Sequence, residues 1–443
     1  MENKHVAVFA FPFGSHLMPL LNLVLKLAHA APNYSFSFIG THKSNAILFP
    51  KPYIPSNIKP YSISDGIPEG HVLGKNPIEK LNLFLETGPD NLHKGIQLAE
   101  ADTNKRVTCI IADAFVTSSL LVANKLNVPW IAFWPPVSCS LSPYFYIEMI
   151  HDLRVNRGGD TTLDFLPGLS KLHVEDIPQD LLLVGEVETV FSRTLVSLGR
   201  VLPQAKAVVM NFFDELDPPL FVQDMRSKLQ SLLYVDPLPS PLLPPPDADP
   251  SGCLSWLDKK SSRSVVYVCF GTVVAPPPHE LAAVAEALEQ SGFPFLWSLK
   301  EGLVSALPSG FVERTSMRGK IVAWAPQAQV LAHDSVGVFV THCGANSVSE
   351  CVWSGVPMIC RPFFGDQGVA GRVIEDVWEI GVMMEGKVFT TKGLLKSLNL
   401  ILELKEGKRI RDNALKVKKI VQDVARPQRQ RDFKALLEII YTS

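Results

Sequence analysis

One short stretch decides the fold class of the C-terminal half of the chain: Val336-Gly337-Val338-Phe339-Val340-Thr341-His342-Cys343-Gly344-Ala345-Asn346-Ser347. Its apolar start, from Val336 to Val340, predicts a buried strand that ends at His342. The chain then turns through Gly344 into a helix whose first backbone N–H groups and positive dipole end can hold a diphosphate. Asn346 and Glu350 lie one turn apart on one face of this helix. A carboxylate at Glu350 can accept hydrogen bonds from both hydroxyls of a ribose.

Further motifs flank this stretch, with Trp324-Ala325-Pro326-Gln327 before it and Asp366-Gln367 after it. Taken singly, each element has an ordinary alternative, in which Gly344 and Ser347 only cap a helix and Trp324 belongs to the core. Together they resemble the donor-binding box of plant UDP-sugar-dependent glycosyltransferases that act on small secondary metabolites. The resemblance covers nearly the whole chain, starting at Phe11-Pro12-Phe13-Gly14-Ser15-His16. Within this family the chain looks most like the flavonoid and anthocyanidin 3-O-glucosyltransferases, whose version of the box matches Arg361-Pro362-Phe363-Phe364-Gly365-Asp366-Gln367.

The composition is that of a large, nearly neutral globular protein. With 443 residues the chain is long for a single core, so we expect two domains. The 42 basic and 44 acidic residues give a net charge of −2, which provides no general attraction for nucleic acid or for an anionic membrane. The seven cysteines are scattered and mostly lie in apolar runs, which favours a reduced, cytoplasmic location.

The N-terminal half contains no segment that is typical of a signal peptide or of a membrane helix. The first residues lack a basic region and a cleavage site, so Val6 to Phe11 predicts a first strand and not a signal peptide. The uncharged run from Leu126 to Ile147 is interrupted by four prolines, which favours a buried strand followed by a loop over a membrane helix. We therefore expect no membrane span.

The alternation of apolar strands and amphipathic segments predicts an α/β fold with parallel sheets. In the first half, expected strands are 6–11, 36–40, 108–112 and 129–133, with a helix from Pro19 to about Ala31. In the second half, expected strands are 265–270, 293–298, 320–323, 336–340 and 357–360, with a helix at 280–291. Such sheets bind ligands beyond the carboxyl ends of their strands.

A proline-rich segment separates the two halves. Residues 236–251 contain too many prolines for a helix or a strand, so we interpret 236–252 as a linker. Asp247-Ala248-Asp249 in this segment matches the Asp-x-Asp of metal-dependent sugar transferases, but solvated surface carboxylates are the more ordinary interpretation. The expected domains are 1–235 for the acceptor and 253–425 for the UDP-sugar. The resemblance implies two facing Rossmann-like, doubly wound domains of the GT-B type, with 426–443 returning to the N-terminal domain.

Transfer of a sugar to a hydroxyl needs a base for the acceptor and stabilisation of the departing diphosphate. His16 follows the first expected strand, and Asp113 ends the strand at 108–112. An aspartate on the far imidazole nitrogen would fix the histidine tautomer and stabilise the imidazolium. We therefore predict His16 as the base and Asp113 as its partner, a prediction that the match to the catalytic loop of the family strengthens.

The resemblance also implies which residues bind the donor. Trp324 would stack on the uracil, with Ala325 and Gln327 nearby. Asp366 and Gln367 would bind the sugar, where a terminal glutamine goes with glucose in this family, and Glu350 would bind the ribose. The remaining residues would hold the diphosphate without a metal or any other cofactor; they are Ser15, Thr272, His342, Asn346 and Ser347.

Two positions depart from the family pattern. Glucose-using relatives usually have tryptophan where this chain has Ala345, and the related 3-O-glucosyltransferases have a sugar-contacting threonine where this chain has Pro135. Both changes leave the identity of the sugar more open than the fold. Aromatic residues that could line a slot for a flat polyphenol, or equally belong to the core, are Phe13, Phe115, Trp134, Tyr144 and Phe364.

Two other classes of protein share some of these sequence features. A nicotinamide-dependent oxidoreductase would share the doubly wound sheets, but the loop after the first strand has no G-x-G-x-x-G. A non-catalytic nucleotide-sugar-binding relative, in which Ala345 and Pro135 mark lost activity, stays open as an alternative, although a binding protein needs neither His16 nor Asp113. We expect a monomeric enzyme whose partners are a UDP-sugar, UDP-glucose first, and a flavonoid acceptor.

Overall fold

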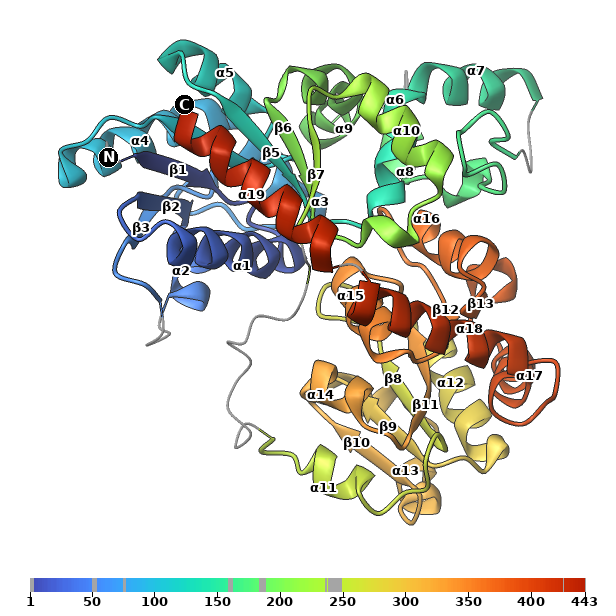
Figure 1. The fold of residues 1–443 in the computed structure, drawn as a ribbon. Helices are drawn as coiled ribbons and strands as arrows, with labels where there is room; N and C mark the ends of the chain where they lie inside the picture. Colours follow the sequence, from blue (N-terminus) through green and yellow to red (C-terminus); the bar gives the residue numbers. More distant parts are fainter. Residues whose placement is uncertain are drawn as a thin grey trace. The chain divides into compact units, whose positions relative to one another are not determined.

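The computed structural model describes residues 4–49, 54–74, 77–157, 162–182, 189–235, 237, 249–424 and 426–442. The chain divides into two compact units (Figure 1). Unit 1 comprises Met1–Pro237 together with Arg426–Ser443, and unit 2 comprises Leu238–Ala425. Within the described residues, no helix is both long enough and apolar enough to cross a membrane.

Unit 1 is built on a seven-stranded parallel sheet with the order β3-β2-β1-β4-β5-β6-β7. Its strands are β1 (His5–Phe9), β2 (Ser35–Thr41), β3 (Ile58–Ile63), β4 (Cys109–Asp113), β5 (Trp130–Trp134), β6 (Ala207–Met210) and β7 (Leu232–Tyr234). Strands β1, β4 and β5 are buried along their whole length, as expected for a sheet covered on both faces. The uncharged run from Leu126 to Ile147 supplies β5 and short helical turns, so it is not a membrane helix.

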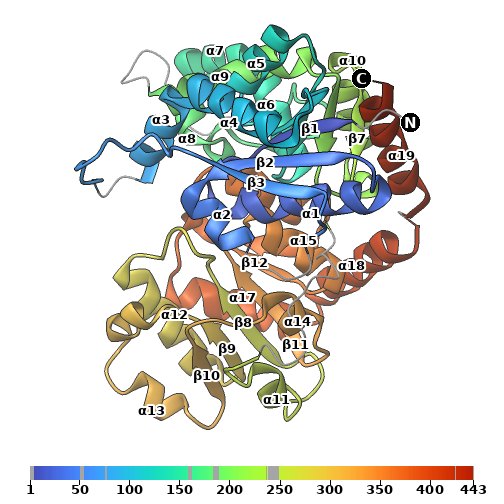
Figure 2. The same ribbon diagram turned by 90° about the vertical axis from the view of Figure 1, so that its left-hand side faces the viewer.

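Helices cover both faces of this sheet. α1 and α2 lie on one face, and α4 and α5 lie on the other (Figure 2). The helices of unit 1 are α1 (Gly14–Ala30), α2 (His42–Leu48), α3 (Pro77–Glu86), α4 (Gly88–Thr103), α5 (Ser118–Leu126), α6 (Ser142–Phe145), α7 (Ile147–Arg157), α8 (Gln179–Leu182), α9 (Val190–Val201), α10 (Pro219–Lys228) and α19 (Arg426–Thr442). The final helix α19 packs on β7, where the Asp432 carboxylate accepts a 2.9 Å hydrogen bond from the backbone N–H of Tyr234.

The first helix begins earlier than its sequence suggested. We expected it to run from Pro19 to about Ala31. In the structure α1 begins at Gly14 and Pro19 lies inside it. Proline at this depth removes only one backbone hydrogen bond, and the apolar face of the helix offsets that loss. His16 therefore lies in the first turn of a helix. The prediction that it lies in a loop after the first strand was wrong.

Unit 2 contains a six-stranded parallel sheet with the order β10-β9-β8-β11-β12-β13. Its strands are β8 (Val265–Cys269), β9 (Phe295–Ser298), β10 (Gly319–Val322), β11 (Val336–Thr341), β12 (Met358–Cys360) and β13 (Gly381–Met383). Its helices are α11 (Cys253–Leu257), α12 (Pro278–Ser291), α13 (Phe311–Thr315), α14 (Gln327–Ala332), α15 (Ala345–Ser354), α16 (Gln367–Arg372), α17 (Thr391–Leu402) and α18 (Lys408–Lys419). With two parallel sheets flanked by helices, the predicted α/β fold class is confirmed.

The core of unit 2 follows from the alternation of side chains along its strands. Val266, Val268 and Trp297 point to one face, where they pack with buried residues of α12 and α17. Tyr267 and Phe339 stack on each other at the intervening positions, with ring centroids 4.9 Å apart. Because successive residues of a strand point to opposite faces, these rings lie on the other face of the sheet. α12 and α14 accordingly lie on opposite sides of this sheet (Figure 1).

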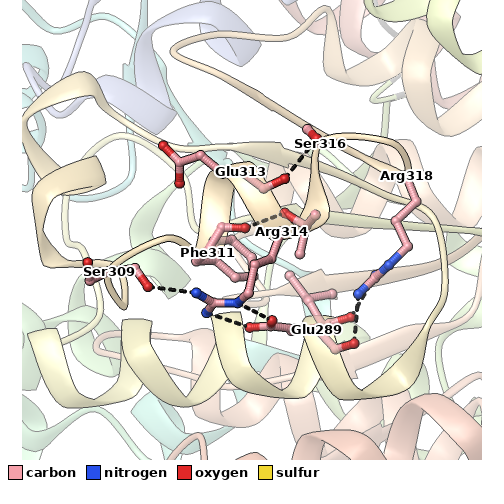
Figure 3. A network of polar contacts seen from close by, with 9 residues as sticks. Glu289, Ser309, Phe311, Glu313, Arg314, Ser316 and Arg318 are labelled. Atoms are coloured by element: carbon pink, nitrogen blue, oxygen red, sulfur yellow. Dashed lines mark hydrogen bonds and ion pairs between the residues drawn. The ribbon is translucent and has the colours of Figure 1, made fainter.

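Two arginines fasten the connection between β9 and β10 to α12 (Figure 3). Arg314 contacts both carboxylate oxygens of Glu289, at 2.5 and 3.0 Å, in a bidentate pair. Arg318 donates to the carbonyls of Leu288 and Glu289 in the last turn of α12, at 2.9 and 2.7 Å. The last carbonyls of a helix lack backbone partners within it, so Arg318 supplies donors to acceptors at the helix end, where Leu288 also accepts the hydroxyl of Ser291 at 2.9 Å.

The proline-rich segment lies largely outside the described residues, including Asp247 and Ala248 of the Asp-x-Asp motif. Asp249 is described, and its two carboxylate oxygens accept the backbone N–H groups of Cys253 and Leu254 at 2.9 and 2.8 Å. Both N–H groups belong to the first turn of α11. The carboxylate of Asp249 thus caps a helix, which is the usual role of aspartate at such a position.

Candidate active site

Each sheet has one place where the strand order reverses, and the predicted site residues gather there. In unit 1 the chain runs outward from β1 to β3 and then returns to add β4 beside β1. In unit 2 the reversal lies between β8 and β11. Connections leave such a pair of strands in opposite directions, which opens a crevice at the carboxyl ends of the strands. His16 follows β1 and Asp113 is the last residue of β4, whereas Thr272 and His342 follow β8 and β11.

At the reversal in unit 1 the structure brings His16 and Asp113 into contact. The Nδ1 atom of His16 lies 2.8 Å from Oδ2 of Asp113. The other carboxylate oxygen of Asp113 accepts a 3.0 Å hydrogen bond from the backbone N–H of Phe115. Asp113 is fully buried, while the His16 side chain remains 13% exposed. With Nδ1 donating to the carboxylate, the Nε2 atom of His16 is left as the proton acceptor.

Aromatic rings surround this histidine. The centroids of the Phe11 and Phe115 rings lie 5.2 and 5.1 Å from that of His16, and Phe13 lies 6.1 Å away. Phe115 stacks on Trp134 at 5.3 Å, and Trp134 in turn contacts Tyr144 at 5.4 Å. The environment of His16 is therefore apolar on several sides, which suits both a flat aromatic ligand and the exclusion of water.

Burial separates the predicted acceptor residues into groups. Phe13 is partly exposed beside His16, and Phe115 keeps a small accessible surface of 7%. Trp134 and Tyr144, at 0% and 3% exposed, form a layer behind Phe115. Phe364 is 40% exposed and belongs to unit 2. In unit 1, then, Phe13 and Phe115 present ring surface next to the base, whereas Trp134 and Tyr144 support Phe115 from within the core.

At the reversal in unit 2 the His342 ring lies against two glycines. A Cβ atom on Gly271 would stand 2.7 Å from Nε2 of His342, and one on Gly344 would stand 2.5 Å from it. Gly271 also has a φ of +72°, a conformation that residues with side chains rarely adopt. The glycines thus allow two loop backbones to approach one imidazole closely, next to the N-terminus of α15, which begins at Ala345.

The surrounding protein keeps His342 uncharged. Burial lowers the pKa of its imidazole to about 4. Its Nδ1 atom is buried and has no hydrogen-bond partner among the described residues. At neutral pH His342 can therefore donate one hydrogen bond to a ligand, but it brings no positive charge to the site.

A hydrogen-bonded cluster joins three of the predicted donor-binding residues. The Nε2 group of Gln327 donates to Oγ of Ser347 at 2.9 Å and to Oε2 of Glu350 at 2.8 Å. Its Oε1 atom lies 3.3 Å from the hydroxyl of Tyr267 in β8. The amide of Gln327 is thus oriented from both ends, and it in turn orients the carboxylate of Glu350. Tyr267 was not foreseen, because a tyrosine inside an apolar strand gives no sign of such a partner.

Trp324 does not belong to the core. It follows β10, and 50% of its surface is exposed, whereas the neighbouring Ala325 is 5% exposed. Because the ring is half exposed and the next residue is buried, one face of the ring is available for stacking at the surface. The alternative in which Trp324 is an ordinary core residue is therefore wrong.

An ion pair holds the loop that leads to Asp366 and Gln367. Arg361 contacts both carboxylate oxygens of Glu280 in α12, with Nε at 2.9 Å from Oε2, and both side chains are almost fully buried. Glu280 also accepts the backbone N–H of Phe389 at 2.8 Å. The guanidinium lies 4.0 Å from the centroid of the Phe363 ring. Bidentate pairing and stacking together fix the start of this loop.

The amide of Gln367 has a defined orientation. Its Oε1 atom accepts the backbone N–H groups of Phe363 and Phe364 at 2.8 and 3.2 Å. Among the described residues no acceptor takes the Nε2 group, so the amide presents its donor end to a ligand. Asp366 directly precedes it at the start of α16.

The other residues singled out in the sequence lie at the starts of helices or directly after a strand. Ser15 is exposed in the first turn of α1, and Asn346 lies in the first turn of α15. Ala345 is the first residue of that helix, and Pro135 is buried directly after β5. In the described parts of the chain, no group of three or more His, Cys, Asp or Glu side chains is arranged to hold a metal ion.

Comparison with known proteins identifies the family. Residues 244–434 match the model of the UDP-glucoronosyl and UDP-glucosyl transferase family. A flavonol 3-O-glucosyltransferase of Actinidia chinensis is 43% identical over 99% of this chain and 97% of its own length. An anthocyanidin 3-O-galactosyltransferase of Rhododendron delavayi is 45% identical over 99% of this chain and 98% of its own. The chain belongs to this family and is a UDP-glycosyltransferase.

A solved structure supports the same assignment. The crystal structure of a UDP-glucose:anthocyanidin 3-O-glucosyltransferase in complex with UDP is 72% identical in sequence and covers all of both chains, with a TM-score of 0.98. At this similarity the two doubly wound units correspond to those of a GT-B glycosyltransferase. The resemblance noted in the donor-binding box is thereby confirmed at the level of the whole chain.

The cluster around Glu350 leads to a prediction about pH. Burial raises the pKa of the Glu350 carboxyl to about 7, while the hydrogen bond from Gln327 acts in the opposite direction. If Glu350 accepts both ribose hydroxyls, its ionised form binds the ribose much more strongly than its protonated form. The ionised fraction falls through pH 7 as the pH is lowered, so uridine affinity should fall about tenfold between pH 8 and pH 6. Calorimetric titration with uridine, which has no phosphate that titrates in this range, measures the effect.

Glu350→Gln provides the control, because an amide does not ionise. Its uridine affinity should be weak and equal at both pH values. His342 stays neutral throughout this range, since burial holds its pKa near 4, and so does not contribute. A wild-type affinity that is the same at pH 6 and pH 8 would show that Glu350 is not the ribose acceptor.

Proposed function

We propose that this enzyme transfers glucose from UDP-glucose to the 3-hydroxyl of a flavonoid, such as a flavonol or an anthocyanidin, with inversion at the anomeric carbon and without a metal. The observation that carries the proposal is the His16–Asp113 pair at the strand reversal of unit 1. A protein that only binds nucleotide sugars needs no such base. The three similar proteins named above are 3-O-glycosyltransferases of flavonols or anthocyanidins, which supports this class of acceptor.

The proposed reaction assigns one step to each part of the pair. Nε2 of His16 takes the proton of the acceptor hydroxyl as its oxygen attacks the anomeric carbon of the donor. The bond from that carbon to the diphosphate breaks, and UDP leaves. Asp113 stabilises the imidazolium that forms and keeps Nδ1 protonated. Because attack occurs opposite the leaving group, an α-linked donor gives a β-linked product.

The acceptor is proposed to lie against Phe13 and Phe115. Both rings stand next to the imidazole, so a flat polyphenol stacked on them would bring a hydroxyl to His16. A phenolic or enolic hydroxyl is also more acidic than that of an alcohol, which makes removal of its proton by a histidine easier. Chemistry and shape thus favour the same class of acceptor.

We further propose that the enzyme acts as a cytoplasmic monomer. All seven cysteines are free thiols, as expected for a reducing compartment. The donor residues proposed on unit 2 are Thr272, Trp324, Ala325, Gln327, His342, Asn346, Ser347, Glu350, Asp366 and Gln367, with Ser15 of unit 1 assisting at the diphosphate.

Replacing the proposed base should remove transfer but not uridine binding. His16→Ala should abolish product formation while the dissociation constant for UDP changes little, because the base acts on the acceptor. Asp113→Asn should fold yet lose on the order of 10²–10⁴ in kcat, since the tautomer is no longer fixed. Product formation from UDP-glucose and a flavonol, followed by liquid chromatography, measures both effects.

His29→Ala is the matched control, because His29 lies exposed near the other end of α1. It should retain wild-type activity. Wild-type rates in His16→Ala would exclude His16 as the base, and a wild-type enzyme inactive on a panel of flavonols and anthocyanidins would refute the proposed acceptor class.

Gln367 allows a sharper test of how the sugar is recognised. Glutamate at this position can still accept the N–H groups of Phe363 and Phe364, but it cannot donate to a sugar hydroxyl. Gln367→Glu should therefore keep the fold and UDP affinity, and should lower kcat/KM for UDP-glucose about 10- to 100-fold. Competition between UDP-glucose and UDP-galactose measures the preference, which matters because relatives with either sugar are similar to this chain.

Gln329→Glu, in helix α14, controls for the added charge. It should leave the preference unchanged, and Ala345→Trp should shift the glucose-to-galactose ratio less than Gln367→His does. If Gln367→Glu behaves like the wild type, or if Ala345→Trp has the larger effect, the sugar is recognised elsewhere.

A further inference from the structure

The residues proposed to hold the diphosphate carry no positive charge on unit 2. Burial keeps His342 neutral, with its pKa lowered to about 4, and Thr272, Asn346 and Ser347 have uncharged side chains. Arg361 is neutralised by Glu280 in a bidentate ion pair. A UDP-sugar carries about two negative charges on its diphosphate, and the departing UDP gains a further one as the bond to the sugar breaks. A nearby cation would stabilise both states.

Lys300 lies beside these residues. Its Nζ atom donates a 2.7 Å hydrogen bond to the backbone carbonyl of Thr272. Thr272 directly follows Gly271, whose backbone lies against the imidazole of His342. Lys300 thus contacts Thr272, whose neighbour Gly271 lies against His342, at the carboxyl edge of the sheet where β8, β9 and β11 end.

The backbone around Lys300 is fixed, while its charge is available. Lys300 follows β9 and precedes a short 3₁₀ helix (Glu301–Ala306), and its carbonyl accepts the N–H of Leu303 at 2.9 Å. Its side chain is exposed and forms no ion pair with any residue that the structure describes. An ammonium group has three donors, so the bond to Thr272 leaves two for a ligand. The arginine contacts at the far end of this connection, shown in Figure 3, hold it to α12.

We propose that Lys300 binds the diphosphate of the donor and stabilises the negative charge that develops on the departing UDP. This inference rests on the proposed use of a UDP-sugar by the site at Thr272 and His342. Lys300 would hold Thr272 through one donor and would approach a phosphate oxygen with another. The role differs from that of the α15 N-terminus, because a full charge attracts phosphate over a longer range than a helix dipole does.

A comparison of ligands with and without phosphate tests the proposal. Lys300→Met keeps most of the length of the side chain but removes the charge. It should weaken UDP binding about 5- to 30-fold at low ionic strength, an effect limited by the exposure of the group, while uridine affinity stays unchanged. Lys300→Arg should retain most of the UDP affinity. Wild-type UDP affinity should fall with added salt more steeply than that of Lys300→Met.

Lys392→Met is the matched control, because Lys392 is an exposed lysine in the first turn of α17. It should bind UDP as the wild type does. Equal UDP affinity in Lys300→Met and the wild type would overturn the proposal. Equal loss of UDP and uridine binding would also overturn it, because Lys300 would then only maintain the loop. Both measurements use binding alone, so they remain decisive even if the proposed acceptor is wrong.

Discussion

The reversal of strand order in each parallel sheet is the constraint on which the rest of this structure depends. Parallel strands bring their carboxyl ends to one edge, and a reversal sends the two following connections apart, so that a crevice opens between them. In unit 1 this places the helix that follows β1 beside the end of β4, and His16 meets Asp113. In unit 2 it places the glycine loop after β8 beside the end of β11, and Gly271 meets His342. The same topology thus positions the proposed base in one unit and the proposed diphosphate site in the other.

The ionisable groups at the two strand reversals differ in the charge that they carry. In unit 1 a buried carboxylate supports a histidine that must gain a proton during the proposed reaction, and rings on several sides exclude water. In unit 2 burial keeps His342 uncharged, so that it can donate a hydrogen bond from one ring nitrogen but carries no positive charge. Burial raises the pKa of Glu350 to about 7. Hydrogen bonds from ligand hydroxyls would lower that pKa again, because they favour the ionised carboxylate. Lys300 would then provide the charge that His342 does not.

Much of this could be predicted from the sequence, because strands, glycine turns and helix starts are local features. The alternating apolar runs predicted the parallel α/β class, and the family resemblance held over the full chain. The start of α1 was misplaced, because Pro19, the first residue of the expected helix, lies inside a helix that begins at Gly14.

Contacts between distant residues were beyond the reach of the sequence. Tyr267 and Gln327 meet only because β8 and α14 pack together, and the ion pair of Glu280 with Arg361 joins segments far apart in the chain. The bond from Lys300 to Thr272 likewise depends on the pairing of β8 with β9. Burial was equally hidden, since Trp134 and Tyr144 have the same aromatic character as Phe13 but lie inside the core.

The anomeric configuration of the product distinguishes direct displacement of UDP from other mechanisms. In the proposed reaction a histidine base at the reversal of unit 1 activates an acceptor hydroxyl for direct displacement of UDP. Wild-type enzyme, UDP-α-glucose and a flavonol should be incubated in excess chelator, and the product analysed by NMR. We expect a single β-linked glucoside on the 3-oxygen, because direct displacement inverts the anomeric carbon of the α-linked donor. An α-linked product, or transfer that occurs only when a divalent metal is restored, would contradict it.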